Sequence, residues 1–415
     1  MLNNISHNRV LKNISALAIL QAFNYAAPLI VLVYLTNVLG VELYGVVAFS
    51  TSIIQISYIL LDFGFSLSAI QKISLYREKK KFISVYIGAI FVIKFIFFLI
   101  VAGCILYYAF TTEKYIEHRL LLALTLLPIF CQAFQPLWFF LGIERMSYIT
   151  ISMVASKVLF VGIVLITVMS EEDYLWVPIA NGASQLVAAA LGLFFLYKNG
   201  YFISPPTTRY VCYAFKSSLG FFLSRASVSI YSTGGAFALG LMSTPAAVSV
   251  YSMSEQLYRV MQSVFVPITQ AIHPYMAKEK NYKFLLKVSI ACFAVVVVGS
   301  LIGYFVSPYL VLYVFGAEWL AILPVLNIFF CVVIVNVIGV ISGYPLAAAL
   351  GKTDVVNRST IYASVVYILC IIFLWLFGMV EPLYLAVALL LVEVAVLAYR
   401  SAKLWPIAYG ELGRM

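Results

Sequence analysis

The chain has 415 residues, of which 64% are hydrophobic and only 10% are charged. Its mean hydropathy is +1.04, and such a chain has too little polar surface to cover a soluble globule. The composition therefore excludes a soluble enzyme or binding module and predicts an all-α polytopic membrane protein.

The predicted elements are long apolar helices. A hydrocarbon core of about 30 Å requires about 20 apolar residues per helix. On this criterion the sequence predicts twelve transmembrane helices, six on each side of a proline-containing loop at residues 199–208. We therefore expect an N-terminal lobe, residues 1–204, and a C-terminal lobe, residues 205–415, related by an axis along the membrane normal. The spans are centred near residues 27, 55, 95, 130, 158, 186, 229, 260, 295, 335, 368 and 392.

Lys and Arg are distributed unevenly between the predicted loops. With the N-terminus in the cytoplasm, twenty of the twenty-six, including Arg400, fall on the cytoplasmic side, and only Lys114 and Arg119 fall on the other. The positive-inside rule then places both termini in the cytoplasm. Topology and the anionic headgroups of membrane lipids account for the net charge of +10, so no nucleic-acid partner is needed.

Polar side chains follow one face of four spans, the first two of each predicted lobe. Spacings of three, four and seven residues place each set on one helical face, and in lipid such a face must point at a neighbour or at water. We therefore expect the two lobes to surround a central cavity. The sets are Gln21, Asn24 and Pro28; Thr51, Gln55, Tyr58 and Asp62; Ser218, Arg225, Ser229 and Ser232; and Ser252, Glu255, Arg259 and Gln262.

Four cations, Lys94, Lys157, Arg225 and Arg259, lie near the middle of predicted spans. A lone Lys or Arg at that depth costs roughly 2.5–3.5 kcal/mol, so such residues normally face a watery cavity, a partner or an anionic substrate. Arg259 can pair with Glu255 four residues earlier, either as structural glue or as part of a site. Arg225 has no carboxylate at a comparable spacing.

Two further carboxylates lie in or near the spans. Asp62 is close to the cytoplasmic end of the second span, where it can also be a solvated boundary residue. Glu393, midway along the last span, can either pair within its own lobe or carry a coupling ion, and the sequence leaves both interpretations open.

Metal and nucleotide chemistry find no support in the sequence. The six cysteines are scattered without a C-x-x-C pair, and the three histidines are isolated, so we expect no metal site. Gly351-Lys352-Thr353 is similar to the end of a phosphate-binding loop, but position 346 is a leucine where that motif requires glycine. We therefore expect no cofactor and no enzymatic activity.

Five strings resemble those of a known family of flippases, and the resemblance extends over essentially the whole chain. The chain is similar to the O-antigen flippases in the polysaccharide transport family of the multidrug/oligosaccharidyl-lipid/polysaccharide exporter superfamily. The strings are residues 34–45, 62–65, 136–146, 229–234 and 267–275.

This resemblance implies transport of an undecaprenyl-diphosphate-linked O-antigen repeat unit from the cytoplasmic to the periplasmic leaflet of a bacterial inner membrane. It also implies alternation between inward-open and outward-open states, with other O-antigen assembly proteins as potential partners. A cationic cavity within lipid independently suits a diphosphate headgroup bearing sugars.

We assign three roles as hypotheses. Arg225 and Arg259 contact the diphosphate, and Lys94 and Lys157 add positive potential. Gln21 and Asn24 hydrogen-bond sugar hydroxyls. A coupling ion, H⁺ or Na⁺, binds one of three carboxylates: Glu255, Glu393 or Asp62.

Two rival classes remain. A multidrug cation antiporter would share the twelve-helix plan, but cationic drugs would be repelled by a cavity with more Lys and Arg than carboxylates. A repeat-unit polymerase or ligase would be expected to have a long periplasmic loop with catalytic charges, whereas the predicted outside loops are short.

Overall fold

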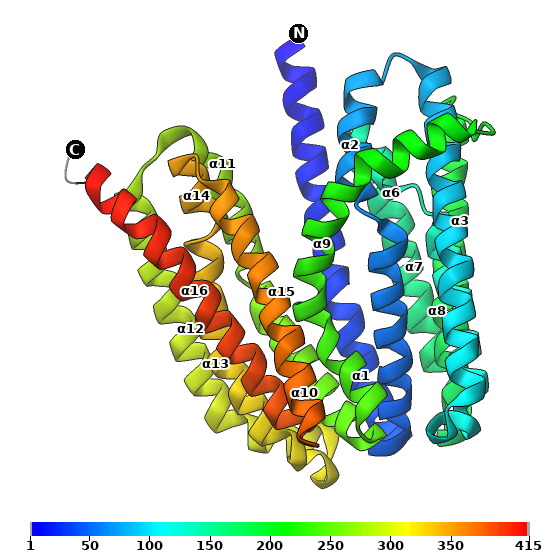
Figure 1. Ribbon diagram of the computed structural model, residues 1–415, viewed down its shortest axis with the longest axis vertical. Helices are drawn as coiled ribbons and strands as arrows, with labels where there is room; N and C mark the ends of the chain where they lie inside the picture. The colour runs from blue at the N-terminus through cyan, green and yellow to red at the C-terminus, as the bar shows by residue number, and fades with distance from the viewer. Residues whose placement is uncertain (1, 413–415) are drawn as a thin grey trace. The chain divides into compact units, whose positions relative to one another are not determined.

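A computed structural model of the protein describes the backbone of residues 2–412 and the side chains of residues 23–410 other than Tyr25 and Ser224. Within that range every regular element is a helix (Figure 1). The longer helices are α1 (Leu2–Asp62), α2 (Phe65–Tyr76), α3 (Lys80–Thr111), α7 (Met146–Thr167), α8 (Trp176–Lys198), α9 (Thr208–Met242), α10 (Pro245–Ser263), α11 (Val266–Glu279), α12 (Tyr282–Leu310), α13 (Leu323–Ile341), α15 (Thr353–Leu376) and α16 (Pro382–Leu412).

Short helices connect or interrupt these. They are η1 (Glu113–His118), α4 (Arg119–Leu124), α5 (Leu126–Ala133), α6 (Leu137–Gly142), η2 (Glu171–Leu175), η3 (Val311–Phe315), η4 (Ala317–Ile322) and α14 (Tyr344–Leu350).

Nine segments of the described chain are long and apolar enough to cross a membrane. The chain is therefore a multi-pass membrane protein. Each of the twelve predicted span centres lies within a described helix, but residues 26–76 form one apolar segment in which two spans are predicted. The segments around residues 229 and 260, in α9 and α10, carry too many polar side chains to be among the nine. Twelve spans in two lobes therefore stay a prediction.

The helix ends follow turn residues that the sequence makes visible. Gly40 interrupts α1 with φ 65° and ψ −177°, outside helical values, in a backbone region that glycine tolerates best. At the start of α10, the Thr244 side chain accepts a hydrogen bond from the Ala247 backbone N–H, and Pro245 occupies the first turn of the helix. These features fix where α10 begins, and hence which of its residues share a face.

The chain divides into two compact units. The first comprises residues 1–43 and 50–226, and the second comprises residues 44–49 and 227–415. The division falls inside α9, and one and a half turns of α1 belong to the second unit. These units are groups of residues in contact, and they need not coincide with two sets of six spans. The predicted lobe boundary at residues 204–205 therefore remains a prediction.

An aromatic core holds the first unit together. Phe65, Phe139 and Phe140 are fully buried, and Phe63 stacks on Phe222 with ring centroids 4.7 Å apart. The connection between α8 and α9 lies close to α3, because the Ser204 backbone N–H donates to the carbonyl oxygen of Ser84 at 3.2 Å.

In the second unit, α13 and α16 pack closely, with α15 on α16 and α12 on α13 (Figure 1). Helix α10 contacts α13 and α16. The buried Tyr251 and Tyr258 of α10 pack edge-on and tilted, respectively, against Phe329 of α13. This packing brings polar residues of α10, α13 and α16 within hydrogen-bonding distance.

Candidate functional site

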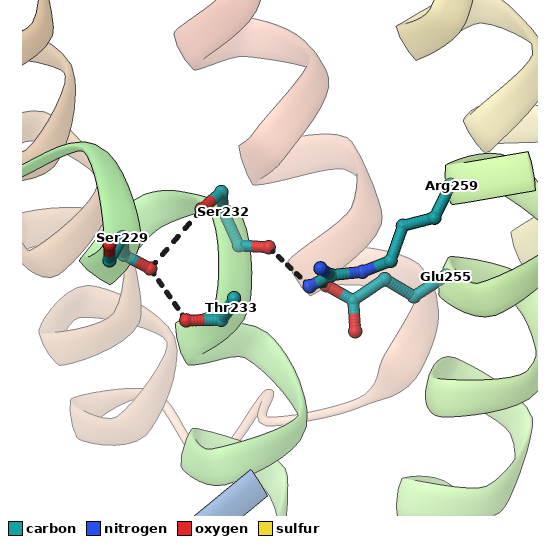
Figure 2. A network of polar contacts seen from close by, with 5 residues as sticks. All are labelled: Ser229, Ser232, Thr233, Glu255 and Arg259. Atoms are coloured by element: carbon teal, nitrogen blue, oxygen red, sulfur yellow. Dashed lines mark hydrogen bonds and ion pairs between the residues drawn. The ribbon is translucent and has the colours of Figure 1, made fainter. Parts of the chain in front are cut away.

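The ion pair expected on α10 is present. The Arg259 guanidinium Nη2 donates to Glu255 Oε1 at 2.9 Å, with side-chain exposures of 35% and 10%. The same nitrogen donates to the backbone carbonyl oxygen of Ser232 on α9, also at 2.9 Å (Figure 2). One turn of α9 is further braced by Thr233, whose hydroxyl donates to the carbonyl oxygen of Ser229 at 2.7 Å. Arg259 therefore ties α9 to α10 and neutralises Glu255.

Arg225 lies in the part of α9 that belongs to the first unit, and its side chain is exposed. Among the described residues, no carboxylate forms an ion pair with it. Its positive charge is therefore not balanced by a described carboxylate, and its contact with a diphosphate stays a prediction.

Lys94 of α3 is 5% exposed and is buried within the first unit. Among the described residues it has no hydrogen-bond or ion-pair partner, and Asp62 is the charged group that acts on it electrostatically. Asp62 in turn accepts a hydrogen bond from the Ser66 hydroxyl at 2.8 Å. Lys157 of α7 is half-buried beside the buried Ser156. The roles assigned to both lysines remain predictions.

The proposed sugar contacts lie on α1. Asn24 is half-buried, and the side chain of Gln21 lies outside the described residues. Their contact with sugar hydroxyls stays a prediction.

Glu393 of α16 is 6% exposed and ends a chain of amide hydrogen bonds. Its Oε1 accepts from Asn336 Nδ2 of α13 at 3.0 Å, and Asn336 Oδ1 accepts from Gln262 Nε2 of α10 at 2.7 Å. Asn336 is not among the site residues predicted from the sequence. It is one of two asparagines in the otherwise apolar α13, and an amide in such a helix needs a partner on another helix.

Arg400 corrects the loop assignment made from the sequence. It lies in α16, not in a loop, with 7% of its surface exposed, and its place on the cytoplasmic side of the membrane stays a prediction. Its Nε donates to the Ser359 hydroxyl at 2.8 Å and its Nη1 to the Gly339 carbonyl oxygen at 2.9 Å. The missed signal is its spacing of seven residues from Glu393, which places both on one face of α16. When Arg400 is left out of the count, the predicted cytoplasmic loops still contain many more Lys and Arg residues than the predicted periplasmic loops.

The two units differ in how the charges in their predicted spans are balanced. In the second unit, the charges that lie in predicted spans or are buried beside them are two cations, Arg259 and Arg400, and two carboxylates, Glu255 and Glu393. Their charges cancel within the unit.

In the first unit, the predicted intramembrane charges are Lys94, Lys157 and Arg225 against Asp62 alone. The predicted spans of this unit therefore carry uncompensated positive charge. In the described part of the chain, no three His, Cys, Asp or Glu residues lie together in a way that could hold a metal ion.

These features define a class: a helical multi-pass membrane protein with cations and carboxylates in its apolar helices. Residues 10–280 match the family described as "Polysaccharide biosynthesis protein", and the chain belongs to that family.

Two curated relatives carry provisional names as O-antigen transporters. One, from Escherichia coli (strain K12), is 24% identical over 291 residues, covering 69% of this chain and 70% of the relative. The other, from Shigella dysenteriae, is 22% identical over 371 residues, covering 86% and 91%.

Solved structures share the fold. "Lipid II flippase MurJ, inward closed conformation" aligns with a TM-score of 0.76 at 13% identity, covering 92% of this chain and 87% of that one. An inward-facing multidrug resistance MATE family transporter aligns with a TM-score of 0.70 at 14% identity, covering 95% and 98%.

Proposed function

We propose that this protein is a flippase that moves undecaprenyl-diphosphate-linked O-antigen repeat units from the cytoplasmic to the periplasmic leaflet of a bacterial inner membrane. It works by alternating access between its two lobes and is driven by an ion gradient. Both termini lie in the cytoplasm, and other O-antigen assembly proteins are its potential partners. Family membership and the provisional names of two relatives support the substrate class.

The observation that carries the proposal is the uncompensated positive charge of the first unit. Arg225 is exposed, lies in an apolar helix and forms no ion pair with a described carboxylate. A guanidinium in a partly desolvated place is well suited to a diphosphate, which it can bind with two parallel charge-assisted hydrogen bonds. Arg259 contributes to the same headgroup, and Lys94 and Lys157 add to the potential.

The rival functions fit these charges less well. A carrier of cationic drugs needs an intramembrane carboxylate open to its substrate, whereas Glu255 is held by Arg259 and Glu393 by Asn336. A polymerase or ligase would need a long loop for its catalytic groups. Between the described helices the longest connection is residues 199–207, which the predicted topology places in the cytoplasm.

The test is a flipping assay with the full-length protein in vesicles. A fluorescent undecaprenyl-diphosphate-linked oligosaccharide is added, and the fraction in each leaflet is followed with a membrane-impermeant quencher. We expect rapid flipping by the wild-type protein, slow flipping by Arg225→Ala and no uptake of a cationic dye. Dye uptake without flipping would favour the antiporter, and extension of the oligosaccharide would favour the enzyme.

A further inference from the structure

Three polar side chains from three helices of the second unit form an unbroken chain that ends on a buried carboxylate. Gln262 of α10 donates to Asn336 of α13, which donates to Glu393 of α16, at 2.7 and 3.0 Å. Asn336 is 8% exposed and Glu393 is 6% exposed. Such a chain has a direction, because each amide offers its NH₂ to one neighbour and its carbonyl oxygen to the other.

Glu393 differs from the other two candidate coupling carboxylates. Glu255 is held in an ion pair, and Asp62 accepts a hydrogen bond from the Ser66 hydroxyl, not from a side-chain amide, among the described residues. Among the described residues, Glu393 forms no ion pair, and Arg400 on the same helix directs its observed hydrogen bonds to Ser359 and Gly339. A buried carboxylate without a bonded cation is costly to keep charged, so a change in its protonation is accessible.

The geometry around Glu393 suits a proton better than a metal ion. Hard cations require several oxygen ligands that converge on one point. Asn336 presents its NH₂ group to Glu393 and turns its carbonyl oxygen toward Gln262. A hydrogen-bond donor in this place stabilises a bare carboxylate but repels Na⁺.

Protonation reverses the chain. When the proton binds Oε1, the oxygen that faces Asn336, that atom changes from acceptor to donor, and Asn336 turns its amide to offer the carbonyl oxygen. Its NH₂ group then faces Gln262, which must present its own carbonyl oxygen in turn. The binding of one proton on α16 thereby changes the orientation of a side chain on α10, three residues from Arg259.

We infer that Glu393 is the proton-binding site of the carrier and that Asn336 and Gln262 relay its state to α10, the helix that carries Arg259. This inference rests on the proposed function and selects the coupling ion and the coupling residue. It assigns to Gln262 and Asn336 a positioning role in which neither needs to contact the substrate.

The charged and titratable side chains around Glu393 keep their protonation state, so Glu393 is the group there that we expect to titrate. Arg400 of α16, Tyr258 of α10 and Tyr231 of α9 act on it electrostatically, and Tyr344 of α14 acts on Arg400 and Tyr231. The side chains that α13 and α15 contribute to these hydrogen bonds, Asn336 and Ser359, are uncharged. Tyrosines remain neutral at physiological pH, so Arg400 is the fixed charge nearby.

The test uses the same vesicles and measures the steady-state ratio of labelled lipid between leaflets. For one proton per cycle, a gradient of about one pH unit should shift this ratio about tenfold, and a comparable Na⁺ gradient at equal pH should not shift it. Glu393→Gln should remove the response to the pH gradient. Gln262→Leu leaves Asn336 and Glu393 in contact but cuts the relay, so the response should again be lost.

Gln185→Leu is the matched control. It removes one partner of a partly buried amide pair in the first unit, where Gln135 Nε2 donates to Gln185 Oε1, also at 2.7 Å. This variant should keep the tenfold response. If Gln262→Leu does not fold, Gln262→Met removes the amide with a side chain of nearly the same length.

Retention of the full pH response by Glu393→Gln would overturn the proton site. So would a wild-type protein that responds to the Na⁺ gradient instead of the pH gradient, if Glu393→Gln loses that Na⁺ response. Retention of the response by the Gln262 variant would overturn the relay. An infrared measurement on the purified protein needs no substrate. It should show a protonated carboxyl band in acid that is lost in Glu393→Gln and kept in Gln262→Leu. A wild-type protein with this band but without flipping would contradict the proposed function alone, and absence of the band would overturn the inference.

Discussion

Replacing Arg259 with alanine should destabilise the protein, because the change leaves Glu255 without its counter-ion. The Glu255 side chain is only 10% exposed, and it contacts the Arg259 guanidinium at 2.9 Å. Removing one partner of a buried ion pair costs about 3–5 kcal/mol. Since the Arg259 side chain is 35% exposed, water screens part of the interaction, and we expect the lower end of that range, about 3 kcal/mol.

A double-mutant cycle isolates this cost. The variant Glu255→Ala/Arg259→Ala removes the stranded carboxylate together with its partner, and it should recover about 2 kcal/mol relative to Arg259→Ala. Arg259→Lys keeps the charge but cannot serve both Glu255 and the Ser232 carbonyl oxygen, and should cost about 1 kcal/mol. The free energy of unfolding is measured by denaturant titration in detergent. A double variant no more stable than Arg259→Ala would refute the argument.

The same variants separate structural glue from a substrate contact. If Arg259 binds the diphosphate, the double variant should fold well and still flip poorly. If the pair only joins α9 to α10, flipping should recover along with stability. We expect the first result, and wild-type flipping by the stable double variant would remove Arg259 from the site.

Three further outcomes are expected. Arg225→Ala should slow flipping about tenfold to a hundredfold, as for the loss of a hydrogen bond between charged groups, at unchanged stability, and lysine at this position should restore part of the rate. Single cysteines at Lys79 and Glu172 should be labelled by an impermeant reagent from the cytoplasmic and the periplasmic side, respectively, because the predicted topology separates them. Gly88→Ala should destabilise the protein by about 1–3 kcal/mol in an unfolding titration, because a Cβ there would lie 2.0 Å from a backbone carbonyl oxygen of the α8–α9 connection. Gly103→Ala on the same helix is the control. A Cβ there meets no atom within 4 Å, so this variant should be neutral or stabilising.

Each of these has a contrary result. Unchanged flipping by Arg225→Ala at normal expression would exclude that residue. Labelling at position 79 but not at position 172 in intact spheroplasts would reverse the topology. Equal stability of the two glycine variants would mean that the α8–α9 connection can move away from α3.

What the sequence predicts well is local. The Glu255–Arg259 pair, for example, follows from a spacing of four residues on one helix. The hydrogen bond between Asn336 and Glu393 joins residues 57 positions apart, and a single sequence contains no information on which helices pack together. Hydropathy likewise does not identify α9 and α10 as spans, because their polar side chains lower the mean hydropathy of these helices.

Arg400 shows why charge counting alone misassigns such residues. Near the end of an apolar run, an arginine can extend its head toward water, so a loop assignment is the natural prediction. The structure instead gives its guanidinium two acceptors inside the second unit. With Arg400 counted beside Glu393, the charges of α10 and α16 named above cancel within that unit, whereas the charges in the predicted spans of the first unit do not. Because an anionic headgroup is attracted to net charge, we expect the first unit to supply most of its electrostatic attraction. The second unit, in which these charges cancel, is the better place for a carboxylate that gains and loses a proton. Protonation of Glu393 there creates a net positive charge, and loss of the proton removes it.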